Sequence, residues 1–232
     1  LKEKYATKQP YGEWLDNNLI KLEDLKIPNK KVPAHTKEER ARLQKAFGYT
    51  YEDFRTSILP MALNGSESIG AMGIDTPLAV LSNRHQPLFN YFKQLFAQVT
   101  NPPIDSIREK IVTSTTVYLG KDGNILEEQP ENCKNLKINN PILTNTDLLK
   151  IKNMKVEGFK VETIPITYYK NTSIEKAIDH LFVEVDRAHR EGTNIVILSD
   201  RGVDENHVAI PSLLAVGAVQ HYLVQTKKRT SM

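Results

Sequence analysis

The chain has 232 residues, of which 40% are hydrophobic and 25% are charged, and its 31 basic and 28 acidic side chains leave a formal net charge of +3. This composition is typical of a globular protein with a sizeable core, and the charge excess is too small to indicate a nucleic-acid-binding surface. Cys133 is the only cysteine, which excludes an internal disulfide. No apolar run approaches the roughly 18 residues of a membrane-spanning helix, and no signal peptide is evident, so we expect a soluble protein of a reducing compartment.

Residues 1–35 are predicted to form an irregular N-terminal extension. Lysines and asparagines separate its apolar side chains, and Pro10, Pro28 and Pro33 interrupt it. A short helix could cover Trp14–Leu19. The segment has too few periodic apolar residues to fold alone, so we expect it to pack onto a neighbouring part of the protein.

Two helices are predicted next. Thr36 and Glu39 have the spacing of a capping box, in which each side chain bonds the backbone N–H of the other residue. Gly48 is a typical residue after the end of such a helix. A second helix is expected to begin at Thr50 and to end at Pro60, because proline lacks the N–H that a helix interior requires.

The stretch Gly65–Asp105 is the most unusual part of the sequence. It contains a loop of small residues up to Gly73, an apolar strand predicted at Leu78–Leu81, an apolar helix predicted at Leu88–Val99, and a turn at Thr100–Asp105 with two consecutive prolines. Glycines allow close backbone approach, and prolines stiffen the turn. The stretch is therefore expected to hold loops in one fixed shape.

The middle of the chain is predicted to be irregular. We expect a helix from Asp105, a strand at Thr115–Leu119, a turn at Lys121–Asn124 that could lead a hairpin into Ile125–Leu126, and a loop over residues 127–141. Thr144 or Thr146 is expected to cap a short helix after that loop.

The last third of the chain predicts an α/β fold with a mostly parallel sheet flanked by helices. Phe159–Tyr168 is a predicted strand, edge or irregular because it contains a proline. Thr172 and Glu175 suggest a capping box for a helix that ends at Gly192, and Ile195–Leu198 has the continuous apolar character of a parallel strand covered on both faces. A further helix is expected to start at Pro211. This order of strand, helix, strand and helix is the α/β repeat.

Two loops are candidate binding sites, because function in such folds gathers after the ends of strands. Asp200 and Arg201 follow the predicted buried strand, and Ser82-Asn83-Arg84 follows Leu78–Leu81. Asp200 and Arg201 could bind a polar ligand, or they could pair with each other and cap the next helix. The likeness of the two tripeptides hints that both follow equivalent strands of one sheet.

No motif in the sequence indicates a catalytic centre. Gly70–Gly73 lacks the spacing of a phosphate-binding loop. The histidines do not form metal-binding pairs, no cysteine–histidine cluster has zinc or iron–sulfur spacing, and no serine stands in a nucleophile elbow.

One long string identifies a family. DTPLAVLSNR…LFNYFKQLFAQVTNPPIDSIRE, within 75–109, closely resembles the central domain of glutamate synthase, in its large-subunit or ferredoxin-dependent form. Shorter stretches that agree with the family lie at Phe47–Phe54, Pro60–Gly73, Ile197–Val203 and Ile210–Leu223. Residues 4–15 resemble the end of the preceding glutaminase domain. Ala71, Asn83 and Gln220 depart from the family pattern of Ser, Asp and His.

The resemblance implies a role in a larger enzyme. Such enzymes make two glutamates from glutamine and 2-oxoglutarate, using an N-terminal cysteine for glutamine hydrolysis, a tunnel for ammonia, and FMN with an iron–sulfur cluster for reduction. Ferredoxin or an NADPH-oxidising subunit would supply electrons, in the cytoplasm or the plastid stroma. Residues 1–35 would then be the end of the glutaminase domain, and residues 36–232 the central α/β domain, cut before the flavin domain.

By itself this chain is then expected to be inactive and to hold no cofactor, with the glutaminase and FMN domains as partners and neither nucleic acid nor membrane. The resemblance places Met72, Thr100 and Asn101 at the wall of the ammonia tunnel. Two alternatives stay open: these residues could belong to ordinary interdomain packing, or the chain could be an independent α/β enzyme or ligand-binding domain that uses the Asp200–Arg201 loop.

Overall fold

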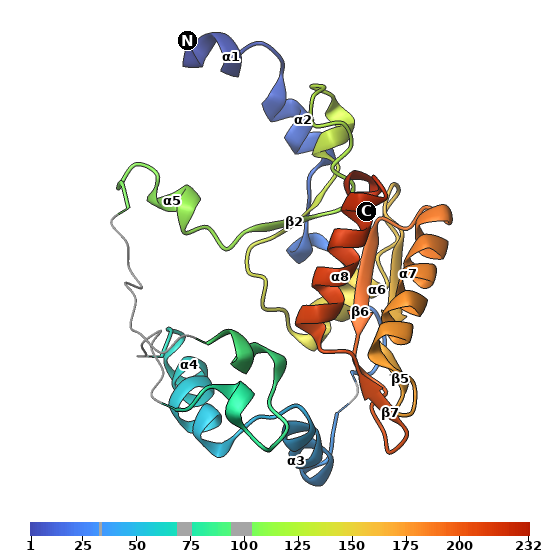
Figure 1. Cartoon of the computed structure of the whole chain (residues 1–232). Coiled ribbons are helices and arrows are strands. Elements are labelled where there is room, and N and C mark those ends of the chain that lie inside the picture. The colour runs from blue at the N-terminus through green and yellow to red at the C-terminus, as the bar shows by residue number, and fades with distance from the viewer. Residues whose placement is uncertain (33, 69–75, 94–103) are drawn as a thin grey trace. The chain divides into compact units, whose positions relative to one another are not determined.

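The computed structural model describes residues 1–32, 34–68, 76–93 and 104–232 (Figure 1). The chain divides into two compact units: unit 1 comprises residues 1–32 and 113–232, and unit 2 comprises residues 33–112. All buried side chains of the described residues belong to unit 1. Within the described residues, no helix is long and apolar enough to cross a membrane.

A strand–helix–strand–helix repeat forms the centre of unit 1. It consists of β4 (Val161–Pro165), α7 (Ile174–Arg190), β6 (Ile195–Ser199) and α8 (Ser212–Gln225), and β4 pairs with β6 in parallel. This confirms the α/β class, although the described strands form three small sheets and not one. The apolar side of α7 is buried because its residues recur at helical spacing: Ala177, Leu181, Val185 and Ala188.

Both helix starts in this repeat lie close to their predicted positions. Pro211 precedes α8 directly, as predicted. The cap of α7 is Ser173, whose side chain accepts a hydrogen bond from the Lys176 backbone N–H at 3.5 Å. The predicted capping box of Thr172 with Glu175 is therefore wrong by one residue, because either hydroxyl is a suitable cap and local pattern alone does not choose between neighbours.

Alternate side chains of β6 face two separate clusters of the core. Val196 and Leu198 pack against the cluster formed mainly by α7 and α8. Ile195 and Ile197 pack against a second cluster, which contains residues of β3 (Leu136–Ile138) and α6 (Asn145–Lys152). The predicted cover on both faces of this strand is confirmed.

The predicted strand Phe159–Tyr168 is divided in two. β4 ends at Pro165, and β5 (Thr167–Tyr169) pairs with β7 (His207–Ala209) in antiparallel orientation. Between them, Ile166 donates its N–H to the carbonyl of Ser199 at 2.9 Å and accepts one from Ile210 at 2.9 Å. Pro165 thus lies at an irregular strand end, as predicted.

A three-stranded sheet joins the N-terminal extension to the middle of the chain. Its order is β1 (Ile20–Lys21), β3 and β2 (Val117–Leu119), with β1 parallel and β2 antiparallel to β3. The extension also forms α1 (Lys2–Ala6), α2 (Tyr11–Asn18) and the short 3-10 helix η1 (Leu22–Asp24), in which Leu22 is buried. Its assignment to the end of a glutaminase domain stays a prediction.

Residues 121–141 differ from the prediction. The hairpin into Ile125–Leu126 is wrong: both side chains are exposed, and β2 pairs with β3, which lies inside the predicted loop over residues 127–141. The turn does not lead a hairpin because Gly123 donates its N–H to the carbonyl of Thr230 at 3.1 Å. The 3-10 helices η5 (Pro130–Cys133) and η6 (Arg229–Ser231) complete unit 1.

In unit 2, the first predicted helix is confirmed and the second is longer than predicted. α3 (Lys37–Ala46) begins at the Thr36–Glu39 capping box. After Thr50, a π-helical segment η2 (Asp53–Ile58) leads directly into α4 (Leu59–Asn64). The predicted end at Pro60 is wrong, because the wider π turn comes before the proline and places it in the first turn of α4, where a missing N–H is tolerated.

The rest of unit 2 has shorter elements than predicted. Leu78–Leu81 is not a strand: a 3-10 helix η3 (Ala79–Leu81) takes its place. The predicted helix Leu88–Val99 is represented by the 3-10 helix η4 (Leu88–Phe92), after which Lys93 is extended and residues 94–99 lie outside the described part. α5 (Glu109–Val112) is shorter than the helix predicted from Asp105. The described apolar residues here are largely exposed, so packing does not extend these elements.

Candidate functional site

The loop after β6 lies at the carboxyl end of the parallel strand pair, as the sequence predicted. The backbone of Ser199 ends β6, and its side-chain Oγ accepts a hydrogen bond from the Arg201 N–H at 3.3 Å. Gly202 follows with a φ of +112°, a conformation that other residues rarely adopt. The loop therefore turns sharply out of the strand and starts the connection to β7.

Arg201 contacts α6 and not Asp200. Its Nη2 donates a hydrogen bond to Oδ1 of Asn145, the first residue of α6, at 2.7 Å. Thr144 caps the same helix: its hydroxyl accepts from the Asp147 N–H, while the Asp147 carboxylate accepts from Thr144. This capping box settles the choice between Thr144 and Thr146.

The expectation that Asp200 and Arg201 pair and cap the next helix is not met. Arg201 instead connects the strand-end loop to a helix 56 positions earlier in the chain. α8 has no side-chain cap hydrogen bond. Asp200 is half-buried, and no hydrogen bond or ion pair holds its carboxylate among the described residues.

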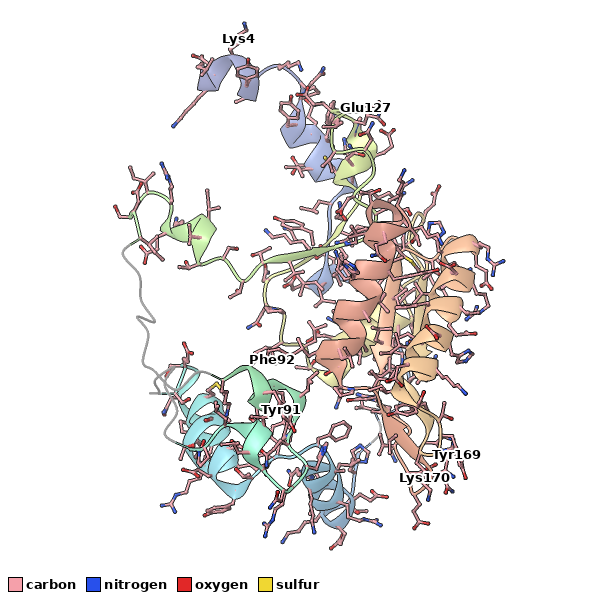
Figure 2. All side chains as sticks on the ribbon, viewed as in Figure 1. Lys4, Tyr91, Phe92, Glu127, Tyr169 and Lys170 are labelled. Carbon is pink, nitrogen blue, oxygen red and sulfur yellow. The ribbon has the colours of Figure 1, made fainter. Side chains whose placement is uncertain are left out.

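The far side of the loop is held by Asp204 and Lys170. The Asp204 carboxylate accepts the backbone N–H groups of Asn206 and His207 and lies 2.9 Å from Nδ1 of His207. These bonds, the one from Asn206 first, hold the pKa of Asp204 below its usual value. Lys170, which lies beside Tyr169 at the end of β5 (Figure 2), donates from Nζ to the carbonyl of Glu205 at 3.0 Å.

This arrangement positions a loop and supplies no catalytic group. The carboxylate of Asp204 already accepts three donors, and Arg201 is already bound to Asn145. The Asp200 carboxylate could still accept a hydrogen bond or a cation from outside. Among the residues that the structure describes, no group of three or more His, Cys, Asp or Glu side chains could hold a metal ion.

The second predicted loop belongs to unit 2. Ser82 Oγ accepts from the Arg84 N–H at 3.1 Å and from the Gln86 side chain at 3.2 Å, so Ser82-Asn83-Arg84 forms a local turn. It follows a 3-10 helix and not a strand. The expectation that the two tripeptides follow equivalent strands of one sheet is therefore wrong.

A cleft of about 710 Å³ lies within unit 2. Its lining comes from the segment between α3 and η2 and from η2 itself, from Thr76–Ala79, and from the region of η4. Gly48 has a φ of +78°, and a Cβ there would lie 2.5 Å from Cγ of Pro87, so only glycine allows this approach of the two segments. The Asp53 carboxylate is held by Thr50 in the helix cap. The other titratable groups of the lining are Tyr49, Glu52, His85 and Lys93.

The predicted tunnel-wall residues Met72, Thr100 and Asn101 lie outside the described residues. Sequence reasoning missed Asn145, Lys170, Asp204 and His207, which hold the strand-end loop. The capping spacing of Thr144 and Asp147 could have placed Asn145 in a first helical turn, but nothing in the sequence pairs it with Arg201.

Comparison with known proteins identifies the family. The model of the glutamate synthase central domain matches residues 42–232. The chain is 39% identical over 235 residues to the NADPH glutamate synthase large chain of Bacillus subtilis (strain 168), which covers 100% of this chain and 15% of that relative. It is 38% identical to the NADH glutamate synthase of Schizosaccharomyces pombe, over 99% of this chain and 12% of the relative.

A plant relative gives the same result. Ferredoxin-dependent glutamate synthase 1, chloroplastic/mitochondrial, of Arabidopsis thaliana is 40% identical over 238 residues, which are 100% of this chain and 14% of that protein. The chain thus spans only 12–15% of the length of these three relatives. With the family model matched over most of its length, the chain belongs to the glutamate synthase central-domain family.

Proposed function

We propose that this chain is the connecting domain of a glutamate synthase, which links a glutaminase domain to an FMN domain of the same polypeptide. The observation that supports this most strongly is the family match over residues 42–232, together with full-chain similarity to three glutamate synthases of whose length it covers 12–15%. The reaction proposed for the full-length protein is glutamate synthesis from glutamine and 2-oxoglutarate. No catalysis is proposed for these 232 residues alone.

Within that enzyme, the segment from Gly70 to Asn101 is proposed to wall the passage of ammonia. A passage for a small neutral amine needs a narrow and stiff wall. Glycines at positions 70 and 73 permit close approach, Met72 fills irregular space, and Pro102-Pro103 restrict the backbone next to Thr100 and Asn101. This part of the proposal rests on residue types and family resemblance.

The cofactors and electron donors are proposed on the same grounds. FMN and an iron–sulfur cluster belong to other parts of the full-length enzyme. The relatives are named for NADPH, NADH or ferredoxin, so a nicotinamide-oxidising partner and ferredoxin are both proposed donors. The alternative of an independent ligand-binding domain gains no support at the strand-end loop, because Arg201 is bound to Asn145.

Replacing Asn101 by Trp in the full-length enzyme tests the passage. A bulky side chain in the wall should block ammonia, so glutamine hydrolysis continues while the share of its nitrogen that reaches glutamate falls about tenfold, equivalent to about 1.4 kcal/mol in relative barrier height. Activity with added ammonia should be retained. Both products are measured in the same assay.

Asn171 provides the matched control, because it is an exposed asparagine in the turn after β5. Asn171→Trp should leave coupling unchanged. If the Asn101→Trp and Asn171→Trp enzymes couple glutamine hydrolysis to glutamate synthesis equally, Asn101 is not part of the passage.

A further inference from the structure

β6 has one paired edge and one open edge. Ile195 donates its N–H to the carbonyl of Lys160 at 3.2 Å, and Ser199 accepts from the N–H of Ile166 at 2.9 Å, so both residues point their backbone groups at β4. The N–H and C=O groups of successive strand residues point to opposite sides. The N–H and C=O groups of Val196 and Leu198 therefore point away from β4, and among the described residues nothing pairs with them.

The edge of this sheet formed by β4 is protected against pairing with a further strand, and the edge formed by β6 is not. On β4, Val161, Thr163 and Pro165 point away from β6, and the proline has no N–H to offer a further strand. β6 has the sequence Ile-Val-Ile-Leu-Ser, without proline, glycine or charge. Exposed edge strands normally carry prolines or charged side chains, which prevent pairing with another strand. Because β6 has neither, its composition is that of an interior strand.

β6 is less buried than an interior strand of its composition would be. Interior parallel strands are buried along their length, but in β6 only Ile195 is fully buried, and Val196, Ile197 and Leu198 are half-buried. Both faces of the strand already contact a core cluster. The half-buried residues include Val196 and Leu198, whose backbone groups point to the open edge.

α8 presents an uncovered apolar surface beside this strand. Ala215, Val219 and Leu223 are buried in the cluster that contains Val196 and Leu198. On the outer side of the helix, Leu213, Val216 and Val224 are 57%, 55% and 53% exposed. Gln220 and His221 are also exposed on this helix, but a solvent-facing side is normally polar throughout. The three exposed apolar side chains therefore indicate that a further structural layer covers this part of α8.

The topology places the missing strand. β4, α7 and β6 form a parallel crossover unit, and α8 then runs back along β6 toward the end of the sheet where β6 begins (Figure 1). Continuation of a right-handed α/β repeat from that end adds a parallel strand beside β6, under α8. The same continuation would bring a helix against the outer side of α8.

We propose that the β6 edge receives a parallel β-strand from the part of the same polypeptide beyond these 232 residues. The inference rests on the proposed function in one respect, namely that the chain is part of a longer enzyme. The chain covers only 12–15% of its relatives, so they are long enough to supply a further strand. A second copy of this chain is disfavoured, because pairing of β6 with itself across a two-fold axis is antiparallel and leaves the outer side of α8 without the next helix of the repeat.

Amide hydrogen exchange in the full-length glutamate synthase tests this proposal. Residue-resolved mass spectrometry of β6 and β4 compares Val196 and Leu198 with Val161 and Thr163, which point to the proline-protected edge. If a strand pairs with β6, the amides of Val196 and Leu198 should exchange at least about 100-fold more slowly than the two control amides. Equal exchange at both edges would overturn the proposal.

The identity of the strand is tested separately. The proposed strand belongs to the same chain, so protection should not change on dilution or on removal of an electron-donating subunit. Protection that is lost on dilution would assign the edge to a second copy, and protection lost with the subunit would assign it to that partner. A density map of the full-length enzyme that shows a strand from within residues 1–232 at this edge would also overturn the proposal.

The two proposals fail in different ways. If Asn101→Trp uncouples the enzyme while the amides of Val196 and Leu198 exchange rapidly, only the strand inference is wrong. If these amides are protected while Asn101→Trp leaves coupling intact, only the proposed passage is wrong.

Discussion

Lys227 is the only residue other than glycine that has a positive φ among the described residues, at +59°. It follows the end of α8, where its N–H bonds the carbonyl of Val224 and the N–H of Lys228 bonds the carbonyl of Leu223, at 3.1 and 2.8 Å. These two bonds define a Schellman motif, whose left-handed position is usually glycine. A side chain with a Cβ is strained in this conformation.

Lys227→Gly should therefore stabilise the protein. Relief of the strain is partly offset by the greater freedom of glycine in the unfolded chain, so we expect a gain of about 0.5–1 kcal/mol in the free energy of unfolding. Urea denaturation measures this. Thr226→Gly, at the preceding residue with a φ of −87°, should destabilise instead, and a gain from both variants would show that strain at Lys227 is not the cause.

At the residue scale, sequence reasoning finds contacts that are close in the chain. The capping box at Thr36 was predicted because Glu39 lies three positions away, and Thr144 was one of the two caps predicted for α6. Arg201 and Asn145 are 56 positions apart, and their hydrogen bond depends on how β6 and α6 meet. The positive φ of Lys227 could not be predicted from the sequence. A lysine at the C-terminal end of a helix is common, because its charge interacts favourably with the helix dipole.

At the scale of elements, α7 holds the segment that follows α8. Asp186 accepts hydrogen bonds from Lys228 Nζ at 2.6 Å and from the Tyr222 hydroxyl at 2.8 Å. The Tyr222 ring stacks on Phe182 with 4.3 Å between centroids. These contacts join α7 to α8 and to the chain that follows α8.

The Asp186 contacts make this junction sensitive to acid. Burial acts to raise the pKa of the Asp186 carboxyl, but the hydrogen bonds from Lys228 and Tyr222 outweigh it and lower the pKa. A carboxyl with a lower pKa in the folded state adds stability at pH values above its unfolded pKa of about 3.9. That stability is lost as the pH falls through the folded pKa.

Asp186→Asn should reduce the free energy of unfolding at pH 7 by about 1 kcal/mol, since the side chain is partly exposed. The difference from the unsubstituted protein should shrink as the pH falls through the lowered folded pKa of Asp186. Asp179→Asn, on the same helix, is the control, because Asp179 is exposed and makes no ion pair among the described residues. A constant difference between Asp186→Asn and the parent at all pH values would exclude the carboxylate as its source.

Element prediction succeeded where apolar residues are dense and periodic. α7 and β6 have a clear helical or continuous apolar pattern, and both formed as predicted. β3 was missed because it has only three residues, with Lys137 between two buried apolar side chains. The strand predicted at Leu78–Leu81 has a convincing local pattern, but a strand also needs a pairing partner, which local pattern does not supply.

At the scale of the whole molecule, burial is distributed unevenly. The two core clusters belong to unit 1, whereas the described residues of unit 2 include no buried side chain. Several large apolar residues of unit 2 are exposed, among them Tyr91 and Phe92 of η4 (Figure 2). Composition alone did not predict this difference, because hydrophobic residues are common in both units and only tertiary packing decides which are covered.

Two isoleucine substitutions measure the difference between the units. Ile164 of β4 is 1% exposed, and Ile111 of α5 is 79% exposed. In the 232-residue chain, Ile164→Ala should lower the free energy of unfolding by about 2–5 kcal/mol, because it removes buried methyl groups and leaves a cavity. Ile111→Ala should change it by less than about 0.5 kcal/mol, as is usual for an exposed site.

The same pair in the full-length enzyme shows whether other parts of the polypeptide cover unit 2. If they bury Ile111, its replacement by Ala becomes costly there, while the cost of Ile164→Ala stays similar because its core lies within unit 1. Urea unfolding followed by far-ultraviolet circular dichroism, which reports on helices of both units, gives the values for the short chain, and thermal inactivation compares the variants of the enzyme. A large loss from Ile111→Ala already in the 232-residue chain would mean that unit 2 has a stable core of its own.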